Sequence, residues 1–408
     1  MTLPADFVFD PLSESFARDP YPVYAALRDH GQPWYFAGYD VWLLSRYEDV
    51  QAAAVHPRLI RSLDGIKTAE EIAEQTVRDN WHDMPNHSRF VQFSMLNSDG
   101  EVHQRLRKLL FREFQSASLA RLKAETQSHV DRLIDNVAGA GEFDFIEDFA
   151  AHVPGHIIGR LLGVPDEDCG ILRTWSEDIV QYFDIDRTDE RKSLAERTTT
   201  EFYHYLLKLS DERRRKPQDD LISRLIGLWD AGELSEDEYI STCMLILMAG
   251  HGSTIDVLGT GLLALLRHPD QMQRLRDDAG LTGTAVQEMF RYDAPLPFFH
   301  RNAVEDVELN GFAVKKGDKL GLLYASANRD AEMFPDADGF DTGRAPNRHL
   351  AFGGGAHFCL GNHLARMDME IIFTSLLRRF PKIEVMAEPE WKCGLSLRGL
   401  DRLQVRAV

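Results

Sequence analysis

Three consecutive glycines stand shortly before a cysteine in the segment FGGGAHFCLG, which runs from Phe352 to Gly361. Consecutive glycines let the backbone turn tightly and approach another group closely. Cys359 is expected at the start of the next helix, where the helix dipole and free backbone N–H groups stabilise a thiolate. A lone thiolate on such a loop suits one axial bond to a metal whose other ligands come from elsewhere, as in haem.

Three other interpretations of this loop stay open at this point. The glycines could cradle a phosphate, although the Lys-Ser/Thr pair that completes a phosphate loop does not follow them. Cys359 could be a nucleophile assisted by His357, but a separation of two residues is a poor guide to pairing in space. A buried cysteine in a structural turn is the plainest interpretation of the cysteine taken alone.

The segment resembles the haem-binding loop of the cytochrome P450 superfamily, F-x-x-G-x-H-x-C-x-G, whose specified positions are filled by Phe352, Gly355, His357, Cys359 and Gly361. The resemblance implies that Cys359 is the axial ligand of the iron of haem b. It also implies that the cofactor is surrounded by Phe352, Gly353, His357 and Gly361.

A second motif lies about 70 residues before the cysteine. Glu288 and Arg291 match the E-x-x-R motif of the family and share one helix face, where an acid and an arginine can pair. The alternative is an ordinary surface pair. The resemblance implies a buried structural pair that supports the haem core. Gly339 stands where many relatives carry a polar residue, so the side chain that completes this network is not specified.

Four basic residues resemble the partners of the haem propionates in this family: His103, Arg107, Arg301 and His349. His103 and Arg107 are four residues apart and share one helix face, which taken alone favours a solvated basic face. Two buried carboxylates need charge-assisted donors, so the family assignment is physically consistent.

The oxygen-binding segment of the family is usually A-G-x-D/E-T-T/S, and this chain has Ala249-Gly250-His251-Gly252-Ser253-Thr254. Ala249 and Gly250 match, and such small residues would leave room for dioxygen above the iron. Gly252 replaces the acid and Ser253 the first threonine. Ser253 and Thr254 are therefore the candidate catalytic residues, with Ser253 orienting a water for proton delivery. His251 and Asp256 are close in sequence, but helix geometry turns them away from Ser253.

The resemblance also implies which residues line a substrate pocket. Each of these residues could equally be an ordinary residue of the hydrophobic core. They are mostly apolar and indicate a small or medium lipophilic substrate. The candidate substrate contacts are Phe93, Leu245, Leu296, Phe298 and Leu397.

Helical periodicity dominates the elements that must hold these residues. We expect a mainly α protein with small β-sheets, the cytochrome P450 fold, with the haem between a long central helix and the cysteine loop. Helices are predicted over 21–30, 102–113, 120–137, 156–162, 196–210, 219–228, 235–267, 284–292 and 360–380. Strands are predicted over 34–37, 41–45, 307–309 and 312–314, the last two joined by an Asn-Gly turn. The segment 210–216 and the segment 331–347 are expected to be loops.

Composition narrows the class of protein further. The 408 residues carry a formal net charge of −19, which disfavours nucleic acid or an anionic membrane surface as a partner. Four scattered cysteines exclude a disulfide framework and a zinc ribbon, and they favour the cytoplasm. The N-terminal residues resemble neither a signal peptide nor a membrane anchor. The apolar run 243–266 is long enough for a bilayer, but His251 and Asp256 in its middle favour a buried helix.

The sequence thus predicts a single domain over residues 1–408 that acts as a cytoplasmic haem-thiolate monooxygenase. It would insert one oxygen atom from O2 into an organic substrate, by hydroxylation or O-demethylation. Electrons would come from a separate ferredoxin or flavodoxin, which is itself reduced by an NAD(P)H reductase. The resemblance implies that this acidic electron donor docks on the basic helix carrying Arg105, Lys108 and Arg112. A peroxide-driven or atypical enzyme (desaturation, coupling) and a non-catalytic haem-binding protein are the alternatives.

Overall fold

The computed structural model describes residues 3–4 and 7–408, and its contacts divide the chain into two compact units. The first unit comprises Met1–Ile66, Thr126–Ala150 and Ser253–Val408, and the second comprises Lys67–Glu125 and Ala151–Gly252. Residues 1–2 and 5–6, which belong to the N-terminal segment where no signal peptide is expected, lie outside the described residues.

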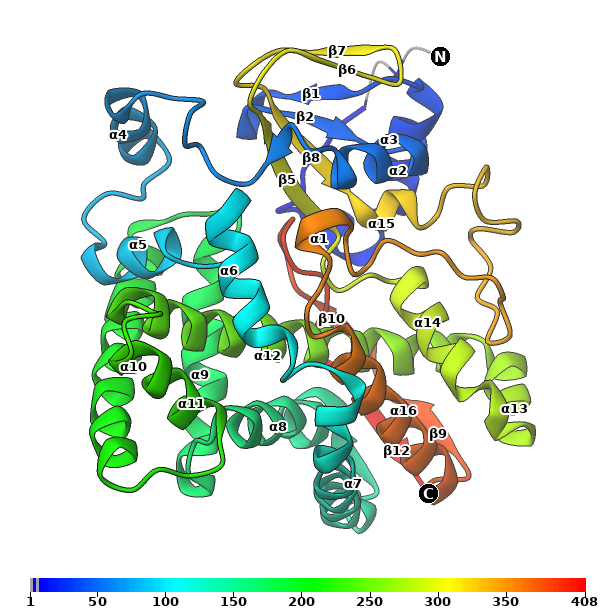
Figure 1. The fold of residues 1–408 in the computed structure, drawn as a ribbon. Helices are drawn as coiled ribbons and strands as arrows, with labels where there is room; N and C mark the ends of the chain where they lie inside the picture. Colours follow the sequence, from blue (N-terminus) through cyan, green and yellow to red (C-terminus); the bar gives the residue numbers. More distant parts are fainter. Residues whose placement is uncertain (1–2, 5–6) are drawn as a thin grey trace. The chain divides into compact units, whose positions relative to one another are not determined.

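The first unit is built on a five-stranded sheet with the strand order β1-β2-β8-β5-β3 (Figure 1). Its strands are β1 (Trp34–Phe36), β2 (Val41–Leu44), β3 (Leu59–Ile60), β5 (Phe298–Ala303) and β8 (Lys319–Leu323). Only the β2–β8 pair is parallel. The predicted hairpin is confirmed as β6 (Val307–Leu309) and β7 (Phe312–Val314). The core of this sheet is apolar and packs against the buried face of α3 (Tyr47–Val55).

Two smaller sheets and several helices complete the first unit. One sheet has the order β4-β12-β9 and the other pairs β10 with β11. Their strands are β4 (Glu142–Asp144), β9 (Ile383–Val385), β10 (Glu390–Trp391), β11 (Leu400–Arg402) and β12 (Gln404–Ala407). The helices are α1 (Glu14–Arg18), α2 (Tyr21–His30), α13 (Pro269–Asp277), α14 (Thr282–Tyr292), α15 (Tyr324–Ala327) and α16 (Asn362–Arg379), and a π-helical turn spans Phe145–Ala150.

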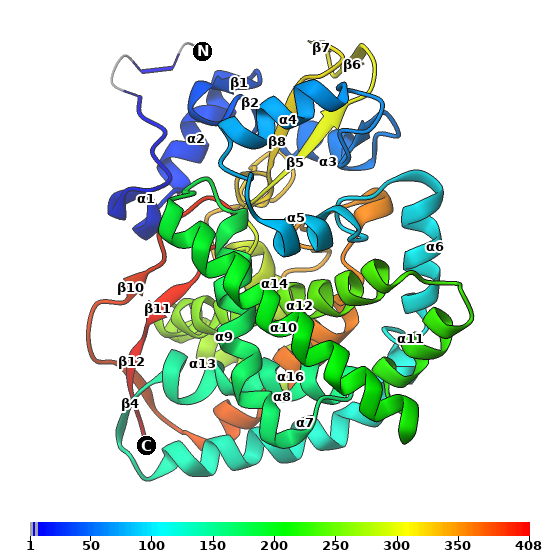
Figure 2. The same cartoon turned by 90° about the vertical axis from the view of Figure 1, so that its left-hand side faces the viewer.

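Helices make up the second unit, and Figure 2 shows α8 to α11 lying together. The helices are α4 (Ala69–Arg78), α5 (Pro85–Gln92), α6 (Gly100–Phe111), α8 (His152–Leu162), α9 (Cys169–Val180), α10 (Asp189–Arg215) and α11 (Leu221–Asp230). Helix α7 (Ser116–Ala138) begins in this unit and ends in the first.

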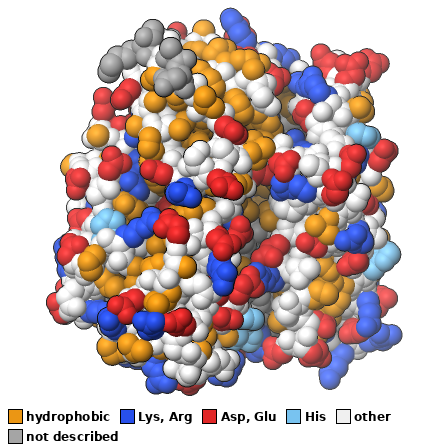
Figure 3. All heavy atoms as spheres, turned by 180° about the vertical axis from the view of Figure 1, so that it is seen from behind, with side chains coloured by type: hydrophobic (Ala, Val, Ile, Leu, Met, Phe, Trp, Pro, Cys, Tyr) orange, Lys and Arg blue, Asp and Glu red, His pale blue; other side chains and the backbone are white. Residues whose placement is uncertain are grey.

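Acidic and basic side chains are interspersed on the face of the molecule that Figure 3 shows, so the net charge of −19 does not gather there in one patch.

The long central helix is α12 (Glu236–Arg267), as the sequence predicts. Ser235 and Glu238 form a capping box at its start, since each side chain accepts a hydrogen bond from the backbone N–H of the other residue, at 3.1 and 2.9 Å. The helix is long and apolar enough to cross a membrane, but 83% of its most apolar window is buried inside the protein. It is therefore a core helix.

One prediction of irregular structure is wrong. The charged segment 210–216 is not a loop, because α10 continues through Arg215. Glu and Arg are good helix formers, and arginines in the last turn interact favourably with the negative end of the helix dipole. Arg213 also turns inward and pairs with buried Asp220 at 2.8 Å. The segment 331–347 is irregular, as predicted.

Candidate functional site

The cysteine loop has a backbone that requires glycine. Gly353 and Gly355 have left-handed φ angles of 67° and 65°. A β-carbon on Gly355 would lie 2.7 Å from the carbonyl oxygen of Ala54, which is too close for any side chain. The loop therefore lies directly on the end of α3. The glycines predicted from sequence to permit a close approach make one, and the partner is the protein's own backbone.

Cys359 leaves this loop just before α16 rather than inside it. Its backbone N–H donates to the carbonyl of Phe352 at 2.9 Å, and its own carbonyl accepts from Asn362 Nδ2 at 2.9 Å. Gly361 is the N-cap residue of α16, so the thiol precedes the first helical residue by three positions. The sequence places the cysteine near this helix end correctly, and the thiol is partly exposed and forms no disulfide.

Arg366 supports the loop from the first turns of α16, a role that sequence reasoning missed. Its guanidinium lies 4.8 Å from the centre of the Phe352 ring and donates to Asn362 Oδ1 at 2.9 Å. Burial lowers the pKa of Arg366, and the charge of Cys359 opposes this change. A signal was available, because Asn362 and Arg366 are four residues apart and so share one face of the helix that follows the cysteine.

Arg301 points to a bound carboxylate beside the loop. It lies in β5 with 1% of its surface exposed, and no carboxylate of the described residues lies within ion-pair distance. Burying an unpaired guanidinium is costly, so an acid from outside the chain is expected there. The Tyr324 hydroxyl is a neighbour of Arg301 and lies 3.4 Å from the position of a β-carbon on Gly353. A haem propionate fits this donor set, and Cys359 fits the iron.

The three other candidate propionate partners differ in their burial and in their hydrogen bonds. His349 is held by protein groups, since Nε2 pairs with Gln287 Oε1 at 3.1 Å and Nδ1 accepts from the Ala351 N–H at 3.3 Å. Burial lowers its pKa to about 3, so it is neutral. In the second unit, His103 is buried and Arg107 half-buried on α6. A contact of these three with a propionate stays a prediction.

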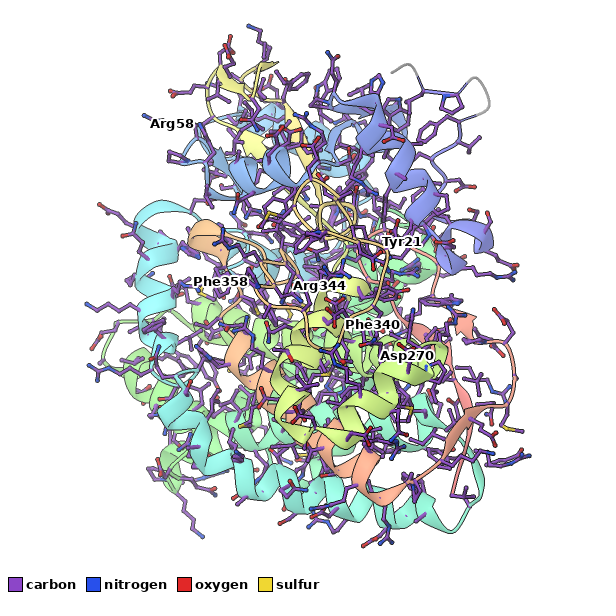
Figure 4. The ribbon with its side chains drawn as sticks, turned by 90° about the vertical axis from the view of Figure 1, so that its right-hand side faces the viewer. Tyr21, Arg58, Asp270, Phe340, Arg344 and Phe358 are labelled. Atoms are coloured by element: carbon purple, nitrogen blue, oxygen red, sulfur yellow. The ribbon has the colours of Figure 1, made fainter. Side chains whose placement is uncertain are left out.

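The E-x-x-R pair is fully buried and is the centre of a larger network. Arg291 donates to both carboxylate oxygens of Glu288 at 2.8 Å. Arg344 Nε lies 3.1 Å from each of these oxygens, and Asn347 Nδ2 lies 3.0 Å from Oε2. Arg344, which is labelled in Figure 4, and Asn347 therefore complete the network from the end of the loop 331–347. Gly339 contributes its carbonyl oxygen to Arg291 at 2.8 Å.

The middle of α12 lacks an acid where the family has one. Asp256 is fully buried and pairs through Oδ1 with Lys392 Nζ at 2.7 Å. His251, in the second unit, packs on α8, where its Cε1 lies 3.2 Å from the β-carbon position of Gly155. Asp256 is thus committed to Lys392 and His251 to the contact with α8. Ser253 is half-buried and Thr254 is buried.

Gly250 has a packing role in addition to its proposed role beside dioxygen. A β-carbon there would lie 2.4 Å from Cδ1 of Ile158 on α8, so the glycine lets two helices of the second unit approach closely. Ala249, one residue earlier, is exposed.

Among the candidate substrate contacts, those of the first unit fall in two settings. Leu296 and Leu397 lie near each other, because the Arg398 N–H donates to the carbonyl of Pro295 at 3.0 Å. Phe298 instead packs into the sheet, with its ring 6.1 Å from that of Tyr39 and against Gly321, which indicates a structural role.

The candidate contacts of the second unit are Leu245, buried in α12, and Phe93, which is 39% exposed at the C-cap of α5. The two elements are tied together, since the Ser241 hydroxyl donates to the carbonyl of Phe90.

The proposed docking helix α6 is less basic than its sequence indicates. Arg105 pairs with Glu238 and donates to the carbonyl of Glu233 at 3.0 Å. Its charge is therefore compensated within the second unit. Lys108 and Arg112 stay exposed on α6 and at its C-terminal end, beside Phe111, which is 51% exposed.

A cysteine on a glycine loop, a buried arginine without an acid partner among the described residues, and a long buried helix are what a haem-thiolate protein requires. The family model for cytochrome P450 matches residues 39–391, and the chain belongs to the cytochrome P450 family. It is an oxidoreductase with the P450 fold whose cofactor is haem b, and the family uses O2 and organic substrates.

Three relatives illustrate the similarity. The chain is 33% identical to the polyketide biosynthesis cytochrome P450 PksS of Bacillus subtilis, over 98% of each chain. It is 34% identical to the 6-deoxyerythronolide B hydroxylase of Saccharopolyspora erythraea, over 97% of each chain. The structure of P450BioI in complex with hexadec-9Z-enoic acid ligated acyl carrier protein superimposes with a TM-score of 0.90 at 31% identity, covering 97% of this chain and 99% of that one.

Proposed function

We propose that this chain is a cytoplasmic monooxygenase that inserts one oxygen atom from O2 into a small or medium lipophilic substrate, by hydroxylation or O-demethylation. The whole chain would act as one haem-thiolate domain, with electrons from a separate ferredoxin or flavodoxin and its NAD(P)H reductase. The observation that carries the proposal is Cys359, held beside α16 on a loop fixed against α3, with buried Arg301 nearby, which has no acid partner in the described part of the chain.

Each group of the chain has a separate part in this proposal. Haem, when bound, supplies the binding and reductive activation of dioxygen, and the Cys359 thiolate would hold its iron and donate electron density. Arg301 and Tyr324 would hold a propionate by hydrogen bonds. The hydroxyl of Ser253 would hold a water and pass its protons on, and the apolar residues near Leu296 and Leu397 would orient the substrate and exclude bulk water.

A peroxide-driven reaction is the second candidate, and the Asp256–Lys392 pair favours it. Gly252 cannot deliver a proton, and the Asp256 carboxylate is committed to Lys392. Hydrogen peroxide brings both of its oxygen atoms already reduced and protonated, so this route needs less proton delivery by the protein.

The test is a binding screen followed by product analysis. Compounds chosen after the relatives' names (macrolactones, free fatty acids and fatty acyl groups on an acyl carrier protein) are screened for the shift of the Soret band on binding. Hits are incubated with NAD(P)H and a surrogate ferredoxin system, or with hydrogen peroxide alone, and the products are identified by mass spectrometry. A product that gains one oxygen, or that loses one O-methyl group with release of formaldehyde, only with NAD(P)H and the ferredoxin system supports the first candidate.

Two further results are decisive. Product formed only with peroxide supports the second candidate. The absence of any product despite tight binding would contradict both. The control Cys359→Ser should lose the red-shifted Soret band of the reduced, CO-bound protein, since the thiolate ligand is gone.

A further inference from the structure

The segment 79–93 of the second unit, which we call the strap, lies against α10. It contains α5, and Figure 2 shows α5 and α10 side by side. Helix α5 buries two residues, His87 and Phe90, and no residue is buried in α4, which precedes the strap and is described in full. A segment with so few buried side chains is expected to open locally more readily than the core of its unit.

One asparagine fixes the beginning of the strap. Asn80 Nδ2 donates to the carbonyl oxygen of Arg187 at 3.0 Å and to Asp189 Oδ1 at 3.1 Å. Its Oδ1 accepts from Lys192 Nζ at 3.1 Å, and its backbone carbonyl accepts from the Tyr182 hydroxyl. The strap is attached here to the 181–188 connection and to the first turn of α10 by polar contacts, which water can replace when the strap opens.

The start of α5 is capped by a side chain of α10. The Glu196 carboxylate accepts from the backbone N–H groups of Asn86 at 3.1 Å and of His87 at 2.9 Å. Asn86 Nδ2 also donates to the Thr200 hydroxyl at 2.8 Å. A carboxylate satisfies free N–H groups at a helix N-terminus and interacts favourably with the helix dipole. The cap of α5 therefore comes from another element and is lost when the two separate.

The imidazole of His87 is enclosed where the strap meets the rest of the unit. It is fully buried, and Nδ1 pairs with the Thr199 hydroxyl at 3.0 Å, while Nε2 has no hydrogen-bond partner among the described residues. Trp81 of the strap stacks on the ring at 5.4 Å, and the rings of Tyr182 and Phe183 lie 6.0 and 5.6 Å away. Because Thr199, Tyr182 and Phe183 lie outside the strap, its separation from them would bring His87 into water.

Each element packed around the imidazole also carries charged or titratable side chains. The strap contributes His82 and Arg89, the 181–188 connection contributes Asp184 and Arg187, and α10 contributes Lys192 and Glu196. Several of them are engaged with other groups, since Arg89 pairs with Asp237 and the Arg187 guanidinium lies 5.2 Å from the centre of the Trp81 ring. Burial, rather than one of these charges, lowers the pKa of His87 to about 3.

A neutral imidazole is therefore locked inside the closed strap, whereas a histidine in water titrates near pH 6.5. Below that pH the open strap binds a proton that the closed strap does not, so acid favours the open state. We propose that His87 makes the strap an acid-sensitive latch, which is closed on α10 at neutral pH and opens locally, ahead of the rest of the unit, as the pH falls.

The size of the effect follows from the two titrations. The stability that His87 gives to the closed strap is complete above pH 6.5 and is lost progressively as the pH falls from 6.5 toward 3. Between pH 7.5 and pH 5.5 the equilibrium constant for opening should rise about tenfold. Phe93, a predicted substrate contact, lies at the C-cap of α5 and would move with the strap. This consequence for the substrate rests on the proposed function, whereas the opening itself does not.

The test is hydrogen exchange followed by mass spectrometry on the ferric holoprotein at pH 7.5 and pH 5.5, for wild type and His87→Gln. The intrinsic exchange rate of residues 89–92 changes with pH equally in both proteins, so the ratio of their rates reports on opening alone. This ratio, wild type over His87→Gln, should rise about tenfold between pH 7.5 and pH 5.5. An unchanged ratio would overturn the proposal. His87→Phe replaces the Gln variant if that variant does not fold.

Two further histidines serve as controls. His82 belongs to the strap but has 39% of its side chain exposed, so His82→Gln should keep the wild-type pH dependence. His251 is also fully buried, and burial lowers its pKa to about 3 as well, but it lies in the core helix α12. Local opening leaves it buried, so His251→Gln should also keep the wild-type pH dependence in residues 89–92.

Global unfolding gives the opposite result for His251. If α5 exchanges only when the whole protein unfolds, both buried histidines are protonated together. His251→Gln would then change the pH dependence of residues 89–92 as much as His87→Gln does, and the latch would be refuted. The measurement needs neither substrate nor turnover, so a failure of the proposed function leaves it intact.

Discussion

The ammonium group of Lys392 lies 2.7 Å from the carboxylate of Asp256, which is fully buried in α12. The pair joins the central helix to the segment that follows β10. Gly399 leaves the space for it, since a β-carbon there would lie only 1.9 Å from Asp256 Oδ1. The backbone N–H of Lys392 also donates to the carbonyl of Gly399 at 3.1 Å, so the base of the 392–399 loop is fixed on α12.

We therefore expect Lys392→Met to destabilise the protein by about 3 kcal/mol, because it removes the cation from a buried carboxylate. The double variant Lys392→Met with Asp256→Asn should lose clearly less stability than the two single variants lose in sum, since no buried charge is left in it. The free energy of unfolding in urea measures both. The control is Lys315→Met, which removes an exposed ion pair with Asp306 of similar length, 2.8 Å, and should leave stability unchanged. Additive effects of the two single variants would contradict the prediction.

A second prediction concerns Ser253 and rests on the proposed function. Ser253→Ala should lower the amount of product formed per NAD(P)H several-fold while NAD(P)H consumption continues, because the hydroxyl that would hold the proton-donating water is missing. Product and NAD(P)H are quantified in the same reaction. Thr260→Val is the matched control, because it removes a buried hydroxyl two turns further along α12. An unchanged ratio in Ser253→Ala would show that this hydroxyl has no part in proton delivery.

The third prediction concerns the loop 331–347. Arg344→Met should destabilise the protein by roughly 3 kcal/mol, because Arg344 lies on both oxygens of buried Glu288 and also donates to the carbonyl of Pro335 at 2.7 Å. The loop should then become sensitive to limited proteolysis. In contrast, Arg274→Met breaks an exposed pair with Asp341 of the same loop and should cost less than about 1 kcal/mol. Equal effects of the two variants would mean that burial of the network does not matter.

The sequence could predict those features of the fold and site that depend on residues close together in the chain. The cysteine loop and the Asn310-Gly311 turn each lie within ten residues, and the structure confirms the tight backbone turn of both. Helix α9 was missed although its pattern was available, since Leu172, Trp175 and Ile179 are buried at helical spacing.

The missed contacts join residues far apart in the chain. Lys392 follows Asp256 by 136 residues, and Glu196 follows His87, whose backbone N–H it binds, by 109. No local pattern specifies these pairs, because tertiary packing decides which distant side chains meet. The ion pair of Arg105 with Glu238 is a further example, since the helix sequence alone indicates a free basic surface.

The last prediction concerns two buried histidines of the second unit, His87 and His251. Burial lowers the pKa of each to about 3, so both are neutral in the fold. In the unfolded chain a histidine titrates near pH 6.5, so below that pH the unfolded state binds the proton more strongly. Their stabilising contribution is therefore complete above pH 6.5 and is lost progressively as the pH falls from 6.5 toward 3. Each histidine should therefore lower the free energy of unfolding by about 2 kcal/mol at pH 5 relative to pH 8.

The measurement is the free energy of unfolding between pH 8 and pH 5 for wild type, His87→Gln and His251→Gln. Each variant should lose less stability than wild type over this range, because it has one fewer group to protonate on unfolding, whatever its stability at pH 8. His363→Gln is the control, since His363 is exposed on α16 and its removal should leave the pH profile unchanged. His251 should show the effect most clearly, because neither ring nitrogen has a hydrogen-bond partner among the described residues, whereas His87 Nδ1 pairs with the Thr199 hydroxyl at 3.0 Å. Parallel pH profiles for His251→Gln and wild type would mean that His251 is already protonated, or solvated, in the folded protein.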